Sequence, residues 1–367
     1  MSKEERRALA RASRRLYGPL RPSPAEMLRE AAAWCEAHGV EWDAYGSGEV
    51  ITAFEARVAE LLGYPAARFV PSGTLAQLVA MRVWCDRAGM HTFGMHPTSH
   101  LELHEERAYA HLHGLQAHLI GPRDRPMLAQ HLEAVQEPLG AVLTELPIRE
   151  AGGQLPTWSE LEALKAAAKD RGVPLHVDGA RLWGCAAAYD RPLHEVTAGF
   201  DSCYVSFYKD VGALSGAMLL GPTALIDDAK RWQRRHGGNL HSLLPNVVTA
   251  AMRLDATLEA MPARLAHTRA LVAALAGIPG VRAYPDPPHT PMFHVVIDLE
   301  GEPAYEARDR VAREHGIWLF GGLFDGQATG TSRMEVSVQG AAMALEPSEV
   351  RRAMMALVGG PQASSAR

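Results

Sequence analysis

Short apolar runs alternate with longer segments of helical periodicity over much of the chain. The runs have the length of buried strands, and segments such as 50–62 and 158–171 carry apolar residues at the spacing of an α-helix. Strands that alternate with helices form a mostly parallel sheet with helices on both faces. The expected strands are 69–70, 92–95, 118–120, 141–144, 173–177, 202–207 and 212–221. The sequence therefore predicts an α/β fold.

The alternation gives way to an α+β pattern from about residue 277, and the 367 residues suit two domains. We expect an N-terminal arm over 1–25, a large domain over 26–255, a small α+β domain over 256–360 and a tail over 361–367. A long helix over 245–275 is expected to break near Pro262. The basic N-terminal segment is expected to form a helical arm that packs on a partner subunit.

The composition argues against several classes of partner. Net charge is -5 with acids and bases interspersed, so neither nucleic acid nor a membrane surface is expected as a partner. No apolar run approaches the roughly 18 residues of a membrane span. The four cysteines lie far apart without metal-ligand spacing, which favours a reduced cytoplasm. His111 and His113 are spaced like metal ligands, but no pattern gathers three or four ligands, so no metal site is expected.

Polar side chains follow three of the expected strands. Asp178 comes after 173–177, Lys209 comes after 202–207, and Ser72-Gly73-Thr74 opens a helix after 69–70. Ligands of such sheets bind at the carboxyl ends of the strands. Each feature alone also fits a helix cap or an exposed charge. Together they favour pyridoxal 5′-phosphate, which needs a lysine for a Schiff base, a carboxylate to keep its pyridine nitrogen protonated, and a helix N-terminus for its phosphate.

Five segments carry a resemblance to a known family. They are Tyr45-Gly46, Pro71-Ser72-Gly73-Thr74, His100 with Glu105, His176-Val177-Asp178-Gly179-Ala180-Arg181, and Ser206-Phe207-Tyr208-Lys209 with Gly212 beyond. In this order they resemble the fold-type-I pyridoxal-phosphate enzymes, and among these the L-threonine aldolase and β-eliminating lyase group. The resemblance implies an aspartate-aminotransferase-like large domain, and the His-Val-Asp-Gly-Ala-Arg motif is its most specific part.

The resemblance also implies roles for individual cofactor-binding residues. Lys209 would hold the cofactor covalently, and Asp178 would pair with the pyridine nitrogen. The phosphate would be bound by the segment Ser72, Gly73 and Thr74, with Ser206 also in contact with the cofactor. His100 would stack on the cofactor ring and act as a base on the β-hydroxyl group of the substrate.

The remaining implied roles concern the substrate and the partner subunit. Arg181 and Arg333 would bind the α-carboxylate of an amino acid, because a guanidinium fork suits a carboxylate. Tyr45 would approach the site of the neighbouring subunit, since active sites of the family lie at a dimer interface. A homodimer or homotetramer is therefore expected.

The implied reaction is retro-aldol cleavage of a β-hydroxy-α-amino acid to glycine and an aldehyde. β-Elimination, racemisation, and a cofactor-binding homologue with little activity stay open as alternatives. The chain departs from the family at several positions, among them Leu75 in place of glutamine and the segment 146–150 in place of an asparagine-rich loop. The cofactor chemistry is therefore predicted more firmly than the identity of the substrate.

Overall fold

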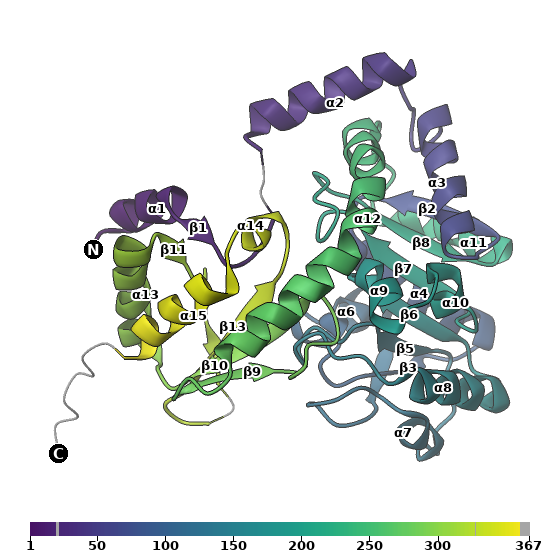
Figure 1. Cartoon of the computed structure of the whole chain (residues 1–367). Coiled ribbons are helices and arrows are strands. Elements are labelled where there is room, and N and C mark those ends of the chain that lie inside the picture. The colour runs from purple at the N-terminus through teal and green to yellow at the C-terminus, as the bar shows by residue number, and fades with distance from the viewer. Residues whose placement is uncertain (20–21, 327, 360–367) are drawn as a thin grey trace. The chain divides into compact units, whose positions relative to one another are not determined.

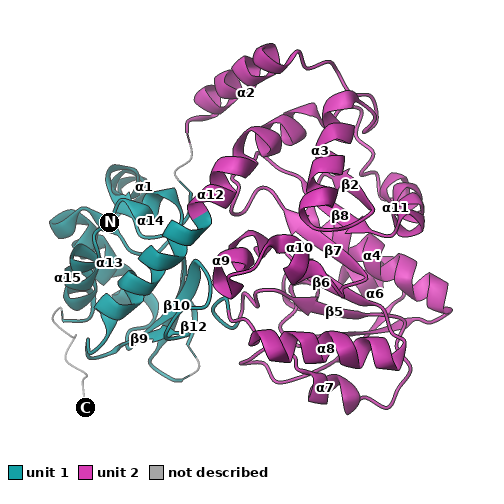
Figure 2. Cartoon of the chain, turned by 45° about the vertical axis from the view of Figure 1, so that its right-hand side comes forward, with its two compact units in different colours: residues 1–20, 151–153, 261–367 teal, residues 21–150, 154–260 magenta. Residues whose placement is uncertain are grey.

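The computed structural model describes residues 1–19, 22–326 and 328–359 (Figure 1). The chain divides into two compact units (Figure 2). The larger consists of 21–150 and 154–260, and the smaller of 1–20, 151–153 and 261–367. The domain boundaries predicted at residues 25, 255 and 360 stay predictions, and the predicted tail 361–367 lies outside the described residues.

The larger unit is built on a seven-stranded sheet. Across the sheet the strands are β2 (Ala66–Val70), β8 (Ala217–Gly221), β7 (Ser202–Ser206), β6 (Leu175–Gly179), β5 (Val142–Glu145), β3 (Thr92–Met95) and β4 (Gln116–Leu119). β8 runs antiparallel to both of its neighbours, and the other six strands all run in one direction. The predicted mostly parallel sheet is confirmed, and the carboxyl ends of six strands lie along one edge.

The larger unit has its own helices, several of which flank the sheet (Figure 1). They are α2 (Pro24–His38), α3 (Glu49–Leu61), α4 (Gly73–Ala88), α5 (His100–Leu103), α6 (Ala108–His113), α7 (Ala129–Glu133), α8 (Trp158–Arg171), the 3₁₀ turn η1 (Leu182–Gly184), α9 (Cys185–Tyr189), α10 (Leu193–Thr197), α11 (Thr223–Arg235) and the first part of α12 (Leu244–Leu275). The bounds of α8 match the prediction because both end signals are strong. Thr157 and Glu160 form a capping box at its start, and Gly172 ends it with a φ of 68°.

The three central strands of the large sheet are buried throughout. Every residue of β5, β6 and β7 is buried, as expected for strands covered on both faces. α4 packs against β7 and β8 and supplies much of the apolar core, including Leu78 and Met81. Burying each such side chain stabilises the fold by about 1.5–3 kcal/mol. Polar residues at the ends of these strands are therefore held by a rigid scaffold.

The smaller unit has an antiparallel four-stranded sheet and a short parallel pair. The sheet order is β12 (Phe324–Asp325), β13 (Ser332–Ser337), β10 (Met292–Ile297) and β9 (Val281–Tyr284), and β1 (Arg14–Arg15) pairs with β11 (Ile317–Trp318). The helices of the unit are α1 (Lys3–Ala12), α13 (Gly301–His315), α14 (Gly340–Met343), α15 (Pro347–Val358) and the rest of α12. This arrangement confirms the predicted α+β pattern.

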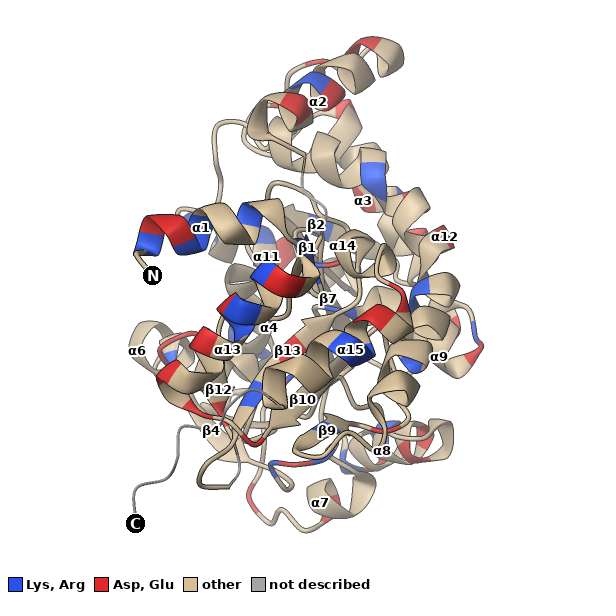
Figure 3. Ribbon diagram, turned by 60° about the vertical axis from the view of Figure 1, so that its left-hand side comes forward, with Lys and Arg blue, Asp and Glu red and all other residues tan. Residues whose placement is uncertain are grey.

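Basic side chains of the N-terminal segment form ion pairs with acidic side chains of the smaller unit. Arg6 lies 2.8 Å from Asp309, and Arg14 lies 2.7 Å from Glu349. Both acidic and basic residues occur along α1, α13 and α15 (Figure 3). The predicted helix in this segment is present as α1, and its predicted contact with a partner subunit stays a prediction.

The predicted break at Pro262 is wrong, because α12 continues through this residue. A proline inside a helix removes a single backbone donor and crowds one carbonyl. Here the neighbouring turns are anchored by buried apolar residues, among them Leu254, Met261 and Leu265. Tertiary packing therefore outweighs the local penalty.

Within the described ranges, no helix combines the length and apolar character that crossing a membrane requires.

Candidate active site

The carboxyl edge of the large sheet collects most of the predicted site residues. Asp178 is the fourth residue of β6, and Lys209 follows the end of β7. His100 begins α5, five residues after the end of β3. Ser72 caps α4 just after β2. Because these strands are parallel, the structure brings the four residues to one edge from four separate parts of the chain.

Asp178 is a buried carboxylate with a fixed orientation. Its side chain is almost inaccessible, and its Oδ1 accepts a hydrogen bond of 2.9 Å from the backbone amide of Ala180. Burial raises the pKa of Asp178, while Lys209, the Ala180 amide and His100 act in the opposite direction. A carboxylate held in this way needs a cationic or proton-bearing partner to stay ionised.

Lys209 lies within electrostatic range of that carboxylate. Burial lowers the pKa of Lys209, and the nearby Arg181 lowers it further. The carboxylates of Asp178 and Glu145 act in the opposite direction. An amine with a lowered pKa is neutral, and hence nucleophilic, for a larger fraction of molecules at neutral pH.

Glu145 is a further acidic residue at this edge, and the sequence reasoning did not assign it to the site. It ends β5 directly beside Asp178 in the sheet register and is 7% exposed. Burial, followed by the charge of Asp178, raises the pKa of Glu145 to about 8. The signal that singled out Asp178, a carboxylate at the end of an apolar strand, would also have found Glu145.

His100 is held at both its backbone and its ring. Its backbone amide donates to Oε1 of Glu145 at 2.7 Å, and its Nδ1 lies 2.8 Å from Oε1 of the buried Glu105. Because a carboxylate only accepts, Nδ1 carries the proton in this pair when Glu105 is ionised. In the neutral ring, Nε2 is then the basic nitrogen. The centroid of the His104 ring lies 5.0 Å from the centroid of the His100 ring.

The start of α4 provides backbone donors at the same edge. Oγ of Ser72 accepts from the amide of Leu75 at 3.3 Å, so this side chain serves as the N-cap. The first amides of a helix have no acceptor within the helix, and they point toward any anion beyond its end. Gly73 is required by packing, since a Cβ here would lie 2.0 Å from the hydroxyl of Tyr204. Thr74 is half-buried in the first turn.

The other predicted residues lie in different places. Ser206 is fully buried at the end of β7, and its carbonyl accepts from the indole of Trp183. Arg181 precedes η1, close enough to Lys209 to influence its pKa. Arg333 lies on β13 of the smaller unit. Tyr45 is 55% exposed, with its ring edge-on to that of His241 at 5.2 Å.

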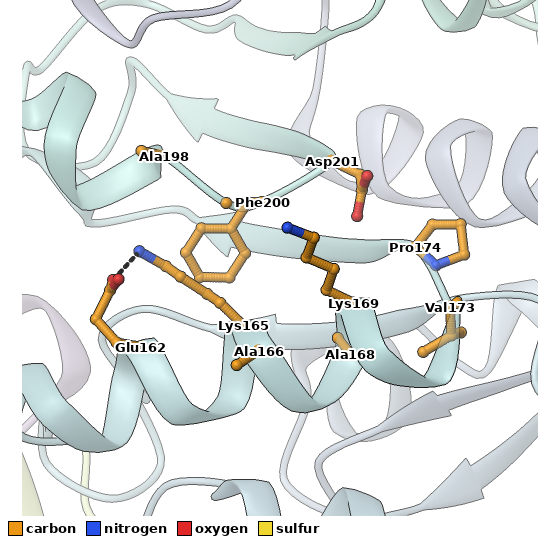
Figure 4. Close-up of a pocket in the computed structure, with 12 residues that line it drawn as sticks. Glu162, Lys165, Ala166, Ala168, Lys169, Val173, Pro174, Ala198, Phe200 and Asp201 are labelled. Atoms are coloured by element: carbon orange, nitrogen blue, oxygen red, sulfur yellow. Dashed lines mark hydrogen bonds and ion pairs between the residues drawn. The ribbon is translucent and has the colours of Figure 1, made fainter.

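A separate cavity of about 790 Å³ lies at the opposite edge of the sheet. It is lined by residues of α8 and by the segments that enter β6 and β7 (Figure 4). Nζ of Lys165 in this cavity lies 2.9 Å from Glu162 and 3.1 Å from the carbonyl of Val196, so two of its three donors already have acceptors. None of the predicted site residues lines it.

Among the described residues no group of three or more histidines, cysteines or acids is placed to hold a metal ion.

Comparison with known proteins agrees with this architecture. A family model described as beta-eliminating lyase matches residues 22–299. The chain belongs to this family. Two solved structures are similar to this chain over nearly its whole length. One, from Listeria monocytogenes EGD-E, is provisionally named an L-allo-threonine aldolase; it is 33% identical, has a TM-score of 0.90, and the match covers 96% of this chain and 99% of that one.

The second structure, from Exiguobacterium sp. 255-15, is provisionally named an aromatic amino acid beta-eliminating lyase/threonine aldolase. It is 34% identical with a TM-score of 0.88, and the match covers 95% of this chain and 99% of that one. Low-specificity L-threonine aldolase 1 of Arabidopsis thaliana is 26% identical over 309 residues, which are 82% of this chain and 85% of the plant protein. The predicted family and the predicted fold-type-I architecture are confirmed, and the protein is a lyase.

Proposed function

We propose that this protein is a pyridoxal 5′-phosphate-dependent aldehyde-lyase that cleaves a β-hydroxy-α-amino acid into glycine and an aldehyde. The observation that carries the proposal is the placement of Lys209 and Asp178 at one sheet edge, within electrostatic range of each other. The similar proteins named as threonine aldolases support the reaction class. Whether pyridoxal 5′-phosphate fits this site depends on the other residues at the same sheet edge.

The residues at this edge match the groups of the cofactor one by one. A lysine with a lowered pKa suits the aldehyde, and a buried carboxylate suits the pyridine nitrogen. The helix N-terminus at Ser72, Gly73 and Thr74 suits a phosphate, with Ser206 at the neighbouring strand end. When bound, pyridoxal 5′-phosphate supplies an electron sink for the charge that develops at Cα as the Cα–Cβ bond breaks.

The chain's own residues then bind, orient and move protons. Arg181 and Arg333 are proposed to hold the α-carboxylate of the substrate, which sets the Cα–Cβ bond in the geometry that favours its cleavage. His100 is proposed to stack over the cofactor ring and to accept the proton of the β-hydroxyl group. Nε2 suits this role, because the hydrogen bond of Nδ1 to Glu105 fixes the tautomer and the ring orientation.

Aldehyde release tests the proposed reaction directly. Purified protein loaded with pyridoxal 5′-phosphate should release an aldehyde and glycine from at least one member of a panel containing threonine, allo-threonine and 3-phenylserine. A coupled alcohol dehydrogenase assay measures the aldehyde, and amino-acid analysis measures the glycine. The matched control is alanine, which has no β-hydroxyl group and should yield no aldehyde. A fully loaded protein that cleaves no member of the panel would contradict the proposal.

We propose further that the active protein is a homodimer or homotetramer in the cytoplasm, with sites at the dimer interface. Several large apolar side chains of the larger unit are exposed, among them Trp42 (78%), Leu28 (57%) and Tyr45 (55%). Large apolar side chains exposed on a single protomer are typical of an interaction surface where they form one patch. All four cysteines are free, which suits a reducing compartment.

Trp42→Glu tests the assembly. A charge in the centre of an apolar interface should dissociate the oligomer, and turnover should fall at least about tenfold if Tyr45 contributes to the neighbouring site. Light scattering coupled to size exclusion gives the mass, and the aldehyde assay gives the activity. Glu41→Gln, at the exposed neighbouring position, is the control and should change neither. A wild-type protein that is monomeric and fully active at micromolar concentration would exclude the interface.

A further inference from the structure

Glu145 connects three parts of the candidate site. It ends β5 in register with Asp178 on β6. Its Oε1 accepts a hydrogen bond of 2.7 Å from the backbone amide of His100, and the backbone amide of Arg149 also bonds to its carboxyl group. The side chain is 7% exposed, so water does not compete for these bonds. The first turn of α5 and the loop after β5 are both attached to this one carboxyl group.

The short length of α5 makes this attachment necessary. The helix has four residues, too few to fix its own direction, and its N-cap residue Ser99 makes no capping hydrogen bond. Glu105 orients the ring of His100, whereas Glu145 holds its backbone. Two acidic side chains therefore determine where His100 lies, and a shift of about 1 Å in such a group can cost about 100-fold in rate.

We propose that Glu145 is a positioning residue for the cleavage, which holds His100 and the loop after β5 at the carboxyl edge of the sheet. The inference rests on the proposed function and goes beyond it. Glu145 touches no reacting atom in this assignment and acts through His100. The loop that it anchors, 146–150, is a segment in which the sequence departs from the family pattern, so this contact ties that loop to the strand ends that carry Asp178 and Lys209.

The protonation state of Glu145 fits a positioning role. Burial raises its pKa to about 8, the charge of Asp178 acts in the same direction, and Lys209 opposes both. The charged groups that surround it are Asp178 on β6, Lys209 after β7, Arg149 in the following loop, and His100 with Glu105 at α5. At pH 7 the carboxyl group of Glu145 is therefore mainly neutral. Ionisation above about pH 8 places a second negative charge beside Asp178.

Alanine and glutamine at position 145 separate the two properties of the side chain. Glu145→Gln keeps an oxygen that accepts from the amide of His100, and its kcat at pH 7 should stay within about threefold of wild type. Glu145→Ala removes the acceptor and leaves a buried donor unpaired, so kcat should fall about 10- to 100-fold with little change in KM. Glu133→Gln, at an exposed site on α7, is the control and should match wild type.

The pH profile distinguishes positioning from a general structural role. Ionisation of Glu145 places a second negative charge beside Asp178, so wild-type kcat should decline on the alkaline side with a midpoint near 8. Glu145→Gln cannot ionise, so its kcat should stay within about twofold between pH 7 and 9. An identical alkaline limb in wild type and Glu145→Gln would overturn the neutral state assigned to Glu145, whereas a Glu145→Gln variant with the kcat loss expected of Glu145→Ala would overturn its role as an acceptor for the amide of His100. This comparison holds even if Glu145→Ala fails to fold.

The circular dichroism of the bound cofactor supplies a readout that needs no turnover. If His100 packs on the cofactor ring, displacing it should reduce the visible ellipticity of Glu145→Ala and leave that of Glu145→Gln unchanged. Equal spectra and equal kcat in wild type and Glu145→Ala would refute the positioning role of Glu145 but not the proposed reaction. A wild-type protein that releases no aldehyde would instead refute the proposed reaction.

Discussion

Lys209→Ala should abolish the covalent attachment of pyridoxal 5′-phosphate and lower kcat at least about 1,000-fold, because no second amine at this edge can replace a lost nucleophile. Within the described ranges, the other lysines of the larger unit lie on α8 and α11, away from the carboxyl ends of β5, β6 and β7. The wild-type protein should show a visible absorbance band that borohydride removes with permanent attachment of the cofactor. In the variant, the cofactor should wash out on desalting after the same treatment.

Lys169→Ala is the matched control for this experiment. Lys169 lies on α8 and lines the cavity at the opposite edge of the sheet, so the band and the kcat of this variant should equal those of wild type (Figure 4). Mass spectrometry after reduction identifies the modified peptide, which should contain Lys209. Attachment at another lysine, or a Lys209→Ala variant with more than about a tenth of wild-type activity, would remove the basis of the cofactor assignment.

The sequence predicted the layers of the fold well because its local signals agree with the tertiary structure. Helix α8 has the expected bounds, since it begins with a capping box and ends at a glycine. The prediction failed at Pro262, where the local rule for proline competes with packing on both sides. The spacing of apolar residues predicts the structure of one segment. It does not show which other segments pack against it, and here that packing decides whether the helix continues.

The candidate site could be predicted as a set of strand ends, but the contacts among its residues could not. The order of the strands is not encoded in any one segment, so the pairing of Glu145 beside Asp178 required the sheet register. Histidines illustrate the same limit. His96 and His176 are fully buried, and both have hydrogen-bond partners within the core, whereas His100 remains a third exposed at the site. No spacing in the sequence distinguishes these cases.

Asp178→Asn should lower kcat by two to four orders of magnitude while the lysine-bound cofactor and its visible band are retained. Removing one partner of a buried charge pair costs about 3–5 kcal/mol, which corresponds to this range of rates. Asparagine keeps the shape of the side chain and can accept the hydrogen bond from the amide of Ala180. It cannot hold the pyridine nitrogen in its protonated form, so the electron sink weakens in the transition state more than in the ground state.

The expected result for Asp178→Asn is therefore a fall in kcat with a KM within about threefold of wild type. Asp170→Asn, at an exposed position near the end of α8, is the control and should leave kcat unchanged. Equal melting temperatures of wild type and Asp178→Asn would exclude unfolding as the cause of the loss. Because Lys209 is intact in this variant, loss of turnover with retention of the band separates the role of the carboxylate from that of the amine. A kcat within about tenfold of wild type would show that the charge of Asp178 does not drive the reaction.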